Sequence, residues 1–116
     1  MRKPNVIVEK TFEFSLSIIE LFKSLQAEKE FVLSRQLLRS ATSIGANINE
    51  AISAESKKDF IHKFSISLKE ARESEYWLRL LEKSNLTQIE VGHYLNEVRQ
   101  IIKIISSIIL TSKRNL

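Results

Sequence analysis

Apolar residues recur at intervals of three and four along four stretches of the chain, a spacing that places side chains on one side of a helix. Such a stripe is typical of helices that pack around a shared core. We therefore predict helices over residues 10–26, 30–54, 57–83 and 87–112. Ahead of them, the β-branched run Val6-Ile7-Val8 predicts that residues 5–9 form an extended lead-in packed on a neighbouring helix.

Short polar breaks separate these stretches. Ser56 with Asp59 has the spacing of a capping box, which starts a helix, and Thr87 begins a second such box. Asn85 suits the left-handed residue that often follows a helix. Connections this short place consecutive helices antiparallel. The chain is thus predicted to be all-α, a single domain over residues 1–116 that forms an up-down-up-down antiparallel four-helix bundle.

The composition narrows the choice of fold and compartment. Two glycines and one proline are too few for the many tight turns of an all-β domain of this length. The lack of cysteine removes disulfides, thiolate metal sites and cysteine nucleophiles. The sequence has neither a signal-peptide pattern nor the run of about 18–20 apolar residues that a bilayer span needs. We therefore expect a cytoplasmic protein with no membrane role.

Patterns that support catalysis or cofactor binding are also missing from the sequence. His62 and His93 are the only histidines, whereas a di-iron bundle needs repeated Glu-x-x-His motifs. Loops that cradle phosphates need more glycine than Gly45 and Gly92 supply. No serine stands in the glycine-flanked turn of a nucleophile elbow. We expect no metal, no cofactor and no catalytic residue, and a protein that is not an enzyme.

Polar side chains stand among the apolar positions of the second and third stretches. Glu75 falls on an apolar stripe, and Glu50 lies close to Asn47 in the sequence. We predict that these three residues and Arg39 form a buried polar network that fixes the register of the two helices. Two inward carboxylates can also act as an acid/base pair. No other catalytic group accompanies them, so the structural interpretation is favoured.

The charge balance is compatible with an anionic partner such as nucleic acid, because 18 lysines and arginines stand against 14 acidic residues, a net charge of +4. Candidate phosphate contacts are Arg35, Arg39, Lys57, Lys58, Lys63 and Arg72. The alternative is an ordinary solvated surface, because Glu70 and Glu73 are interleaved with these cations. Tyr76 and Trp77 are expected in the core or at a subunit interface rather than as platforms for base stacking.

The last stretch carries more apolar residues than one face of a small bundle can bury. Besides its main stripe it has Ile101, Ile104 and Ile108 on a second side. A large exposed apolar patch usually marks an interface, so we predict a homo-oligomer assembled through these three residues. The alternative is that the run Val6-Ile7-Val8 covers them within one subunit.

Two segments carry a more specific pattern, QLLRSATSIGANINEA over residues 36–51 and SKKDFIHKFSISLKEARESEYWLRLL over residues 56–81. Together they resemble the bacterial four helix bundle protein family, also called the 23S rRNA-intervening-sequence protein or S23 family. The matching positions are Arg39, Ser43-Ile44, Ala46-Asn47-Ile48, Glu50-Ala51, Ser56, Phe60, Ala71, Glu75, Tyr76-Trp77-Leu78 and Leu80-Leu81. Asn49 departs from the pattern, because family members often have alanine there.

The resemblance covers nearly the whole chain and implies a small bundle that assembles as a homopentamer. Some family members are encoded inside intervening sequences of ribosomal RNA genes. A related branch, the accessory protein of diversity-generating retroelements, binds nucleic acid and a reverse transcriptase through a basic pentameric barrel. Our leading hypothesis is a non-enzymatic oligomeric bundle that binds RNA or DNA through phosphate contacts. The alternative is a scaffold with a protein partner and no nucleic-acid role.

Overall fold

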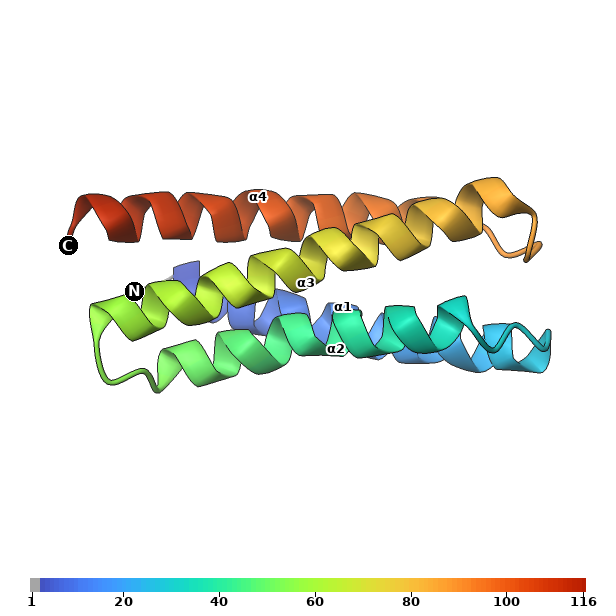
Figure 1. The fold of residues 1–116 in the computed structure, drawn as a ribbon, viewed down its shortest axis with the longest axis horizontal. Helices are drawn as coiled ribbons and strands as arrows, with labels where there is room; N and C mark the ends of the chain where they lie inside the picture. Colours follow the sequence, from blue (N-terminus) through green and yellow to red (C-terminus); the bar gives the residue numbers. More distant parts are fainter. Residues whose placement is uncertain (1–2) are drawn as a thin grey trace.

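Four helices make up the computed structural model, which describes the backbone of residues 3–116 and the side chains of residues 6–116. They are α1 (Lys3–Ala27), α2 (Leu33–Ile52), α3 (Lys57–Ser84) and α4 (Gly92–Arg114). The helices run lengthwise through a molecule of 47 × 20 × 20 Å (Figure 1). α1 and α3 each pack against α2 and α4 and lie diagonally opposite each other. This all-α four-helix bundle is the architecture that the sequence predicts, and residues 3–116 contain no strand.

The beginning of the chain corrects one prediction. Residues 5–9 belong to α1 instead of forming an extended lead-in. Ile7 is fully buried, Val8 is partly buried and Val6 is exposed. Ile7 lies two helical turns before Phe14, so a helix places both side chains in the core. Burial of this stripe outweighs the modest helix penalty of three β-branched residues.

Local polar contacts and one left-handed residue explain several of the helix boundaries. The Ser56 hydroxyl accepts a hydrogen bond from the Asp59 N–H at 3.0 Å, as predicted, and Asn85 has the left-handed φ of 62° after α3. α2 begins at Leu33 and not at residue 30, because the Glu30 carboxylate accepts bonds from the N–H groups of the first residues of that helix. Thr87 accepts a bond from Ile89 within an irregular connection, so α4 begins only at Gly92.

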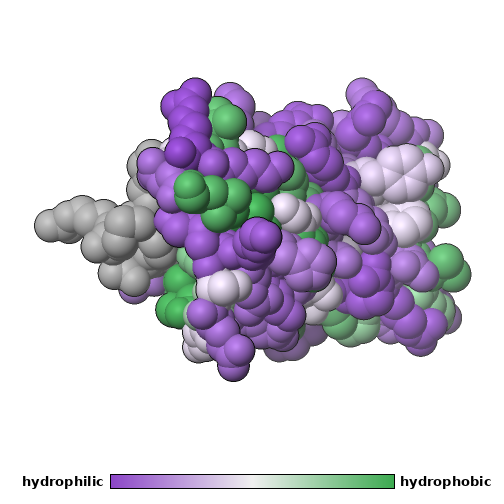
Figure 2. Space-filling model, turned by 60° about the vertical axis from the view of Figure 1, so that its left-hand side comes forward, coloured by the Kyte–Doolittle hydropathy of each residue, from purple (hydrophilic) through white to green (hydrophobic). Residues whose placement is uncertain are grey.

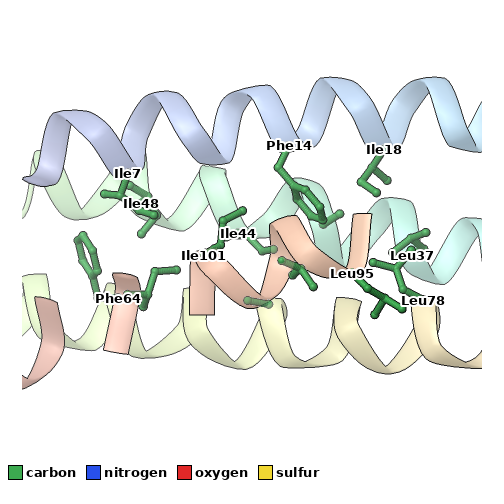
Figure 3. Packing of buried hydrophobic residues seen from close by; sticks show 14 of the residues in the cluster. Ile7, Phe14, Ile18, Leu37, Ile44, Ile48, Phe64, Leu78, Leu95 and Ile101 are labelled. Atoms are coloured by element: carbon green, nitrogen blue, oxygen red, sulfur yellow. The ribbon is translucent and has the colours of Figure 1, made fainter. Parts of the chain in front are cut away.

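Apolar side chains from all four helices meet along the bundle axis. Ile7, Ile48, Phe64 and Ile101 gather toward one end, and Ile18, Leu37, Leu78 and Leu95 toward the other (Figure 3). Two contacts bring α2 close to its neighbours. A Cβ on Gly45 would lie 3.3 Å from Oγ1 of Thr11 in α1, and the buried hydroxyls of Ser40 and Ser74 lie 2.8 Å apart between α2 and α3.

The core of the single chain contains most of the residues predicted to join subunits. Ile101 is fully buried and Ile108 is 6% exposed, while Ile104 is half-buried against the core. The prediction that Ile101 and Ile108 lie at an interface between copies is therefore wrong. α4 buries a wide arc because it packs against both α1 and α3. Ile7 in the first turns of α1 belongs to the same core cluster as Ile101 and Ile108, whereas Val6 is exposed.

Candidate nucleic-acid interface

The outer side of α3 carries cations at regular heptad-like spacing. Successive intervals of four and three residues place one set of side chains along the same side of the helix. We call this set the α3 stripe, and it consists of Lys58, His62, Ser65, Lys69, Arg72, Tyr76, Arg79 and Lys83. All of them are exposed except Ser65, which is half-buried, and none is acidic. At about 1.5 Å per residue the stripe is roughly 37 Å long.

The cations of the stripe have no direct acidic partner. Among the described residues, no carboxylate lies within ion-pair distance of Lys58, Lys69, Arg72, Arg79 or Lys83. Their charge is therefore left facing solvent, where it attracts anions over roughly a Debye length, about 8 Å at physiological salt.

Three acids of α3 pair with cations of the adjacent helices, while Glu82 stays exposed near the end of the stripe. Glu70 and Glu73 both accept hydrogen bonds from Arg39 of α2, the first at 3.2 Å. On the other flank, Glu75 accepts a bond of 2.8 Å from Nε of Arg99 in α4. Acids that alternate with cations in the sequence are thus separated from them in angle around the helix. This arrangement leaves the stripe basic although α3 as a whole is well mixed.

Only part of the predicted set of phosphate contacts comes together. Lys58 and Arg72 belong to the α3 stripe, whereas Lys57 is exposed at the start of α3. The Arg35 guanidinium lies on α2, 5.8 Å from the ring centre of Phe31.

Arg39 and Lys63 are already engaged with acids at the boundary between α2 and α3. The Lys63 ammonium donates to Glu50 at 2.8 Å, which raises the pKa of Lys63. Hydrogen bonds from Arg39 raise the pKa of Arg39 itself and lower the pKa of Glu73. These two cations are less available to phosphate than the free cations of the stripe.

Sequence reasoning missed most of the stripe. His62, Lys69, Tyr76, Arg79 and Lys83 were not among the predicted contacts, although their spacing is readable in the sequence. The useful signal is the angular position of each charge around the helix. A count of acids and bases along the chain obscures it.

The predicted buried polar network is wrong. The Glu50 side chain is 60% exposed and pairs with Lys63. The Asn47 amide donates to the Ser43 carbonyl within α2. Arg39 and Glu75 face different neighbours, and the structure does not join the four residues.

Serines make the buried polar contacts between α2 and α3 instead. In addition to the Ser40–Ser74 pair, the Ser67 hydroxyl donates to the Ile44 carbonyl of α2 at 2.8 Å. Small hydroxyl side chains satisfy their polar groups locally and let the two helices approach closely.

Tyr76 lies outside the core. It is 53% exposed in the middle of the α3 stripe, where the sequence predicted a core or interface residue. Trp77 is partly buried, and its Nε1 donates to Oε2 of Glu73 at 3.0 Å. The two rings meet edge to face, with centroids 5.2 Å apart at 66°.

A second surface feature lies on α1. Phe12 is 59% and Leu16 is 46% exposed, and the half-buried Ile19 continues the same side of the helix. The exposed acids Glu9 and Glu13 stand beside them. Figure 2 shows another view of the surface, in which hydrophilic residues predominate and apolar ones form small groups between them.

Two negative findings apply to the described residues alone. None of their helices combines the length and the apolar content needed to cross a membrane. They also contain no cluster of three or more histidine, cysteine or carboxylate side chains able to hold a metal ion.

Comparisons with known proteins place this bundle among relatives. The model of the family described as "23S rRNA-intervening sequence protein" matches residues 3–107. A crystal structure of a protein of unknown function from the S23 ribosomal protein family of Bacteroides thetaiotaomicron is 49% identical, with a TM-score of 0.88 over 92% of this chain and 97% of that one. No curated protein matches the chain.

Proposed function

We propose that this chain, which belongs to the 23S rRNA-intervening sequence protein family, is a nucleic-acid-binding protein that holds phosphates along the α3 stripe. The observation that carries the proposal is the row of unpaired cations on α3. None of the residues of the stripe is a carboxylate, although the stripe runs along most of a helix of 28 residues in a chain whose net charge is only +4. The name of the family supports the proposal only in general terms, since it refers to an intervening sequence of 23S rRNA.

The stripe suits the physics of phosphate binding. Lysine and arginine that contact phosphates release condensed counterions, which supplies most of the affinity at low salt. Arg72 and Arg79 add a planar fork that can contact a phosphate at two oxygens. Because the proposed contacts are to the backbone, we expect binding with little sequence preference.

A charge-matched pair of variants tests the proposal. Lys69→Gln/Arg72→Gln removes two cations of the stripe, and Lys23→Gln/Lys103→Gln removes two exposed cations elsewhere on the bundle. Binding of labelled RNA and DNA is followed by fluorescence anisotropy across a salt series. The stripe variant should bind more weakly, and the slope of log K against log salt should fall by about 1.4 for single strands and about 1.8 for duplex. The control variant should keep most of the wild-type slope.

Equal losses in the two variants would show that net charge, and not the stripe, determines binding. Absence of binding to any RNA or DNA at low salt would overturn the proposal.

We also propose that the working unit is a homo-oligomer, a pentamer by the resemblance noted above. Its interface is now assigned to the exposed side of α1 around Phe12 and Leu16, because Ile101 and Ile108 lie inside the single chain. Exposed aromatic and aliphatic side chains in one row favour association. A ring of five copies uses two different surfaces of each copy, and the exposed side of α1 supplies one of them; α3 lies diagonally across the bundle from α1. The alternative is that a different protein binds the exposed side of α1, as in the scaffold hypothesis.

A further inference from the structure

We infer that the α3 stripe takes single-stranded nucleic acid, with an unpaired base stacked on the ring of Tyr76. The inference rests on the proposed function and specifies what the stripe binds. Tyr76 stands between Arg72 and Arg79, each about one turn away, and is more than half exposed. Base stacking on an aromatic ring combined with cations that follow the backbone is the usual means of binding single strands without sequence preference.

The ring of Tyr76 is linked to α2 through contacts with Trp77 and Glu73. Trp77 meets it edge to face, with centroids 5.2 Å apart, and Nε1 of Trp77 donates to Glu73. Glu73 also accepts a bond from Arg39 of α2. The aromatic pair is therefore anchored to the boundary between two helices. A ring held in place loses less conformational entropy when a base stacks on it.

The shape of the stripe favours a flexible strand over a duplex. α3 is one long helix set in a bundle about 20 Å wide, whereas the major groove of B-DNA is only about 12 Å wide and winds around its axis. A straight stripe of roughly 37 Å can follow such a groove over a fraction of its length. A single strand can instead lie along all of it. In a duplex the bases are stacked on one another, so Tyr76 would have no free base to contact.

The surroundings of Tyr76 argue against an apolar partner at this position. The cations Lys69, Arg72, Arg79 and Lys83 surround it along the helix. An interface that buried the ring in apolar contacts would also have to desolvate those charges, which is costly without acidic partners. Phosphate groups provide the compensating charge, and the bases between them provide a flat surface for the ring.

Variants at Tyr76 test the inference separately from phosphate binding. The strands are labelled oligo(dT) and oligo(rU) of about 12 nucleotides, a duplex of equal length, and a strand of the same length with abasic sites. Tyr76→Ala removes the ring and Tyr76→Phe keeps it. Phe31→Ala removes another exposed ring, just before α2, and serves as the control.

We expect Tyr76→Ala to weaken binding of the intact single strands about 5-fold or more, while Tyr76→Phe and Phe31→Ala stay close to wild type. The abasic strand should bind the wild type as weakly as the intact strand binds Tyr76→Ala. On the abasic strand, Tyr76→Ala should make no further difference, because the base that the ring contacts is already gone. The salt slope should stay unchanged in Tyr76→Ala, since no phosphate contact is lost.

Two results distinguish failure of the inference from failure of the proposed function. Wild-type affinity in Tyr76→Ala, or tighter binding of duplex than of single strand, would overturn the stacking inference. If Lys69→Gln/Arg72→Gln still weakens binding in that case, the stripe remains the nucleic-acid interface. If the wild-type protein binds none of the strands at low salt, both proposals fall together.

Discussion

The outer sides of α1 and α3 belong to helices that lie diagonally across the bundle, and they differ in chemistry. On α3 the exposed row is basic, with Tyr76 as its one large aromatic ring. On α1 the exposed row contains Phe12 and Leu16, with Glu9 and Glu13 nearby. Both helices bury an apolar stripe in the same core. The core therefore does not explain the difference, and the two exposed sides are suited to different partners, an anion on α3 and an apolar surface on α1.

The comparison between the exposed sides of α1 and α3 requires that the apolar side chains of α4 lie in the shared core and do not form a third exposed interface. Ile101→Ala should lower the free energy of unfolding by about 2–5 kcal/mol, because it leaves a cavity among fully buried side chains. Ile104→Ala, at a half-buried position, should cost clearly less. Urea denaturation at fixed protein concentration measures both. If Ile101→Ala leaves stability unchanged and lowers the mass in light scattering, Ile101 is an interface residue after all.

The proposed role of α1 is tested by adding charge to its exposed row. Phe12→Glu/Leu16→Glu should convert the oligomer to smaller species, because association would bury two unpaired carboxylates. The fold of the single chain should survive, since both side chains are exposed. Mass by light scattering and helix content by circular dichroism provide the readouts. The control Tyr76→Glu places one charge on α3 and should leave the mass unchanged. Equal mass in the α1 variant and the wild type would remove α1 as the interface.

The fold was predictable because the apolar spacing of each helix is regular. Errors arose where spacing and residue type disagreed or where the number of neighbours mattered. The run around Ile7 looked extended by residue type, yet its distance from Phe14 is helical. Ile101 and Ile108 exceeded the number of apolar residues expected on one buried face, because the sequence of a single helix does not show how many other helices surround it. α4 packs against two helices and buries a wider arc.

The pairing of the charges beside the candidate site was less predictable, because it depends on how neighbouring helices are placed against each other. Arg39 and Glu75 were assigned to one network, but they have different partners. Arg39 bonds to Glu70 and Glu73 on one side of α3, and Glu75 accepts a bond from Arg99 of α4. Such pairings depend on the relative register of the helices, and the periodicity of a single helix gives no information about that register. The α3 stripe itself was readable, since its spacing is local to one helix.

The smallest effect concerns the ion pair that separates the α3 stripe from its acidic flank. Arg39→Met should cost only about 0.2–1 kcal/mol, because the Arg39 side chain is 51% exposed and solvent screens the pair. The pair lowers the pKa of Glu73, so its stabilisation is present above the unfolded pKa of the carboxyl, about 4.3, and is lost as pH falls through the folded value. Urea denaturation of wild type and Arg39→Met at several pH values measures this difference. It should be largest near neutral pH and vanish in acid, and it should also shrink in high salt.

Gln36→Met, an exposed change on the same helix, is the control. A stability difference that persists unchanged at acidic pH would mean that Arg39 acts through packing and not through its charge. Loss of the pair also frees Glu73 to approach the α3 stripe, so Arg39→Met should weaken nucleic-acid binding slightly if this pair keeps the acid away from the cations.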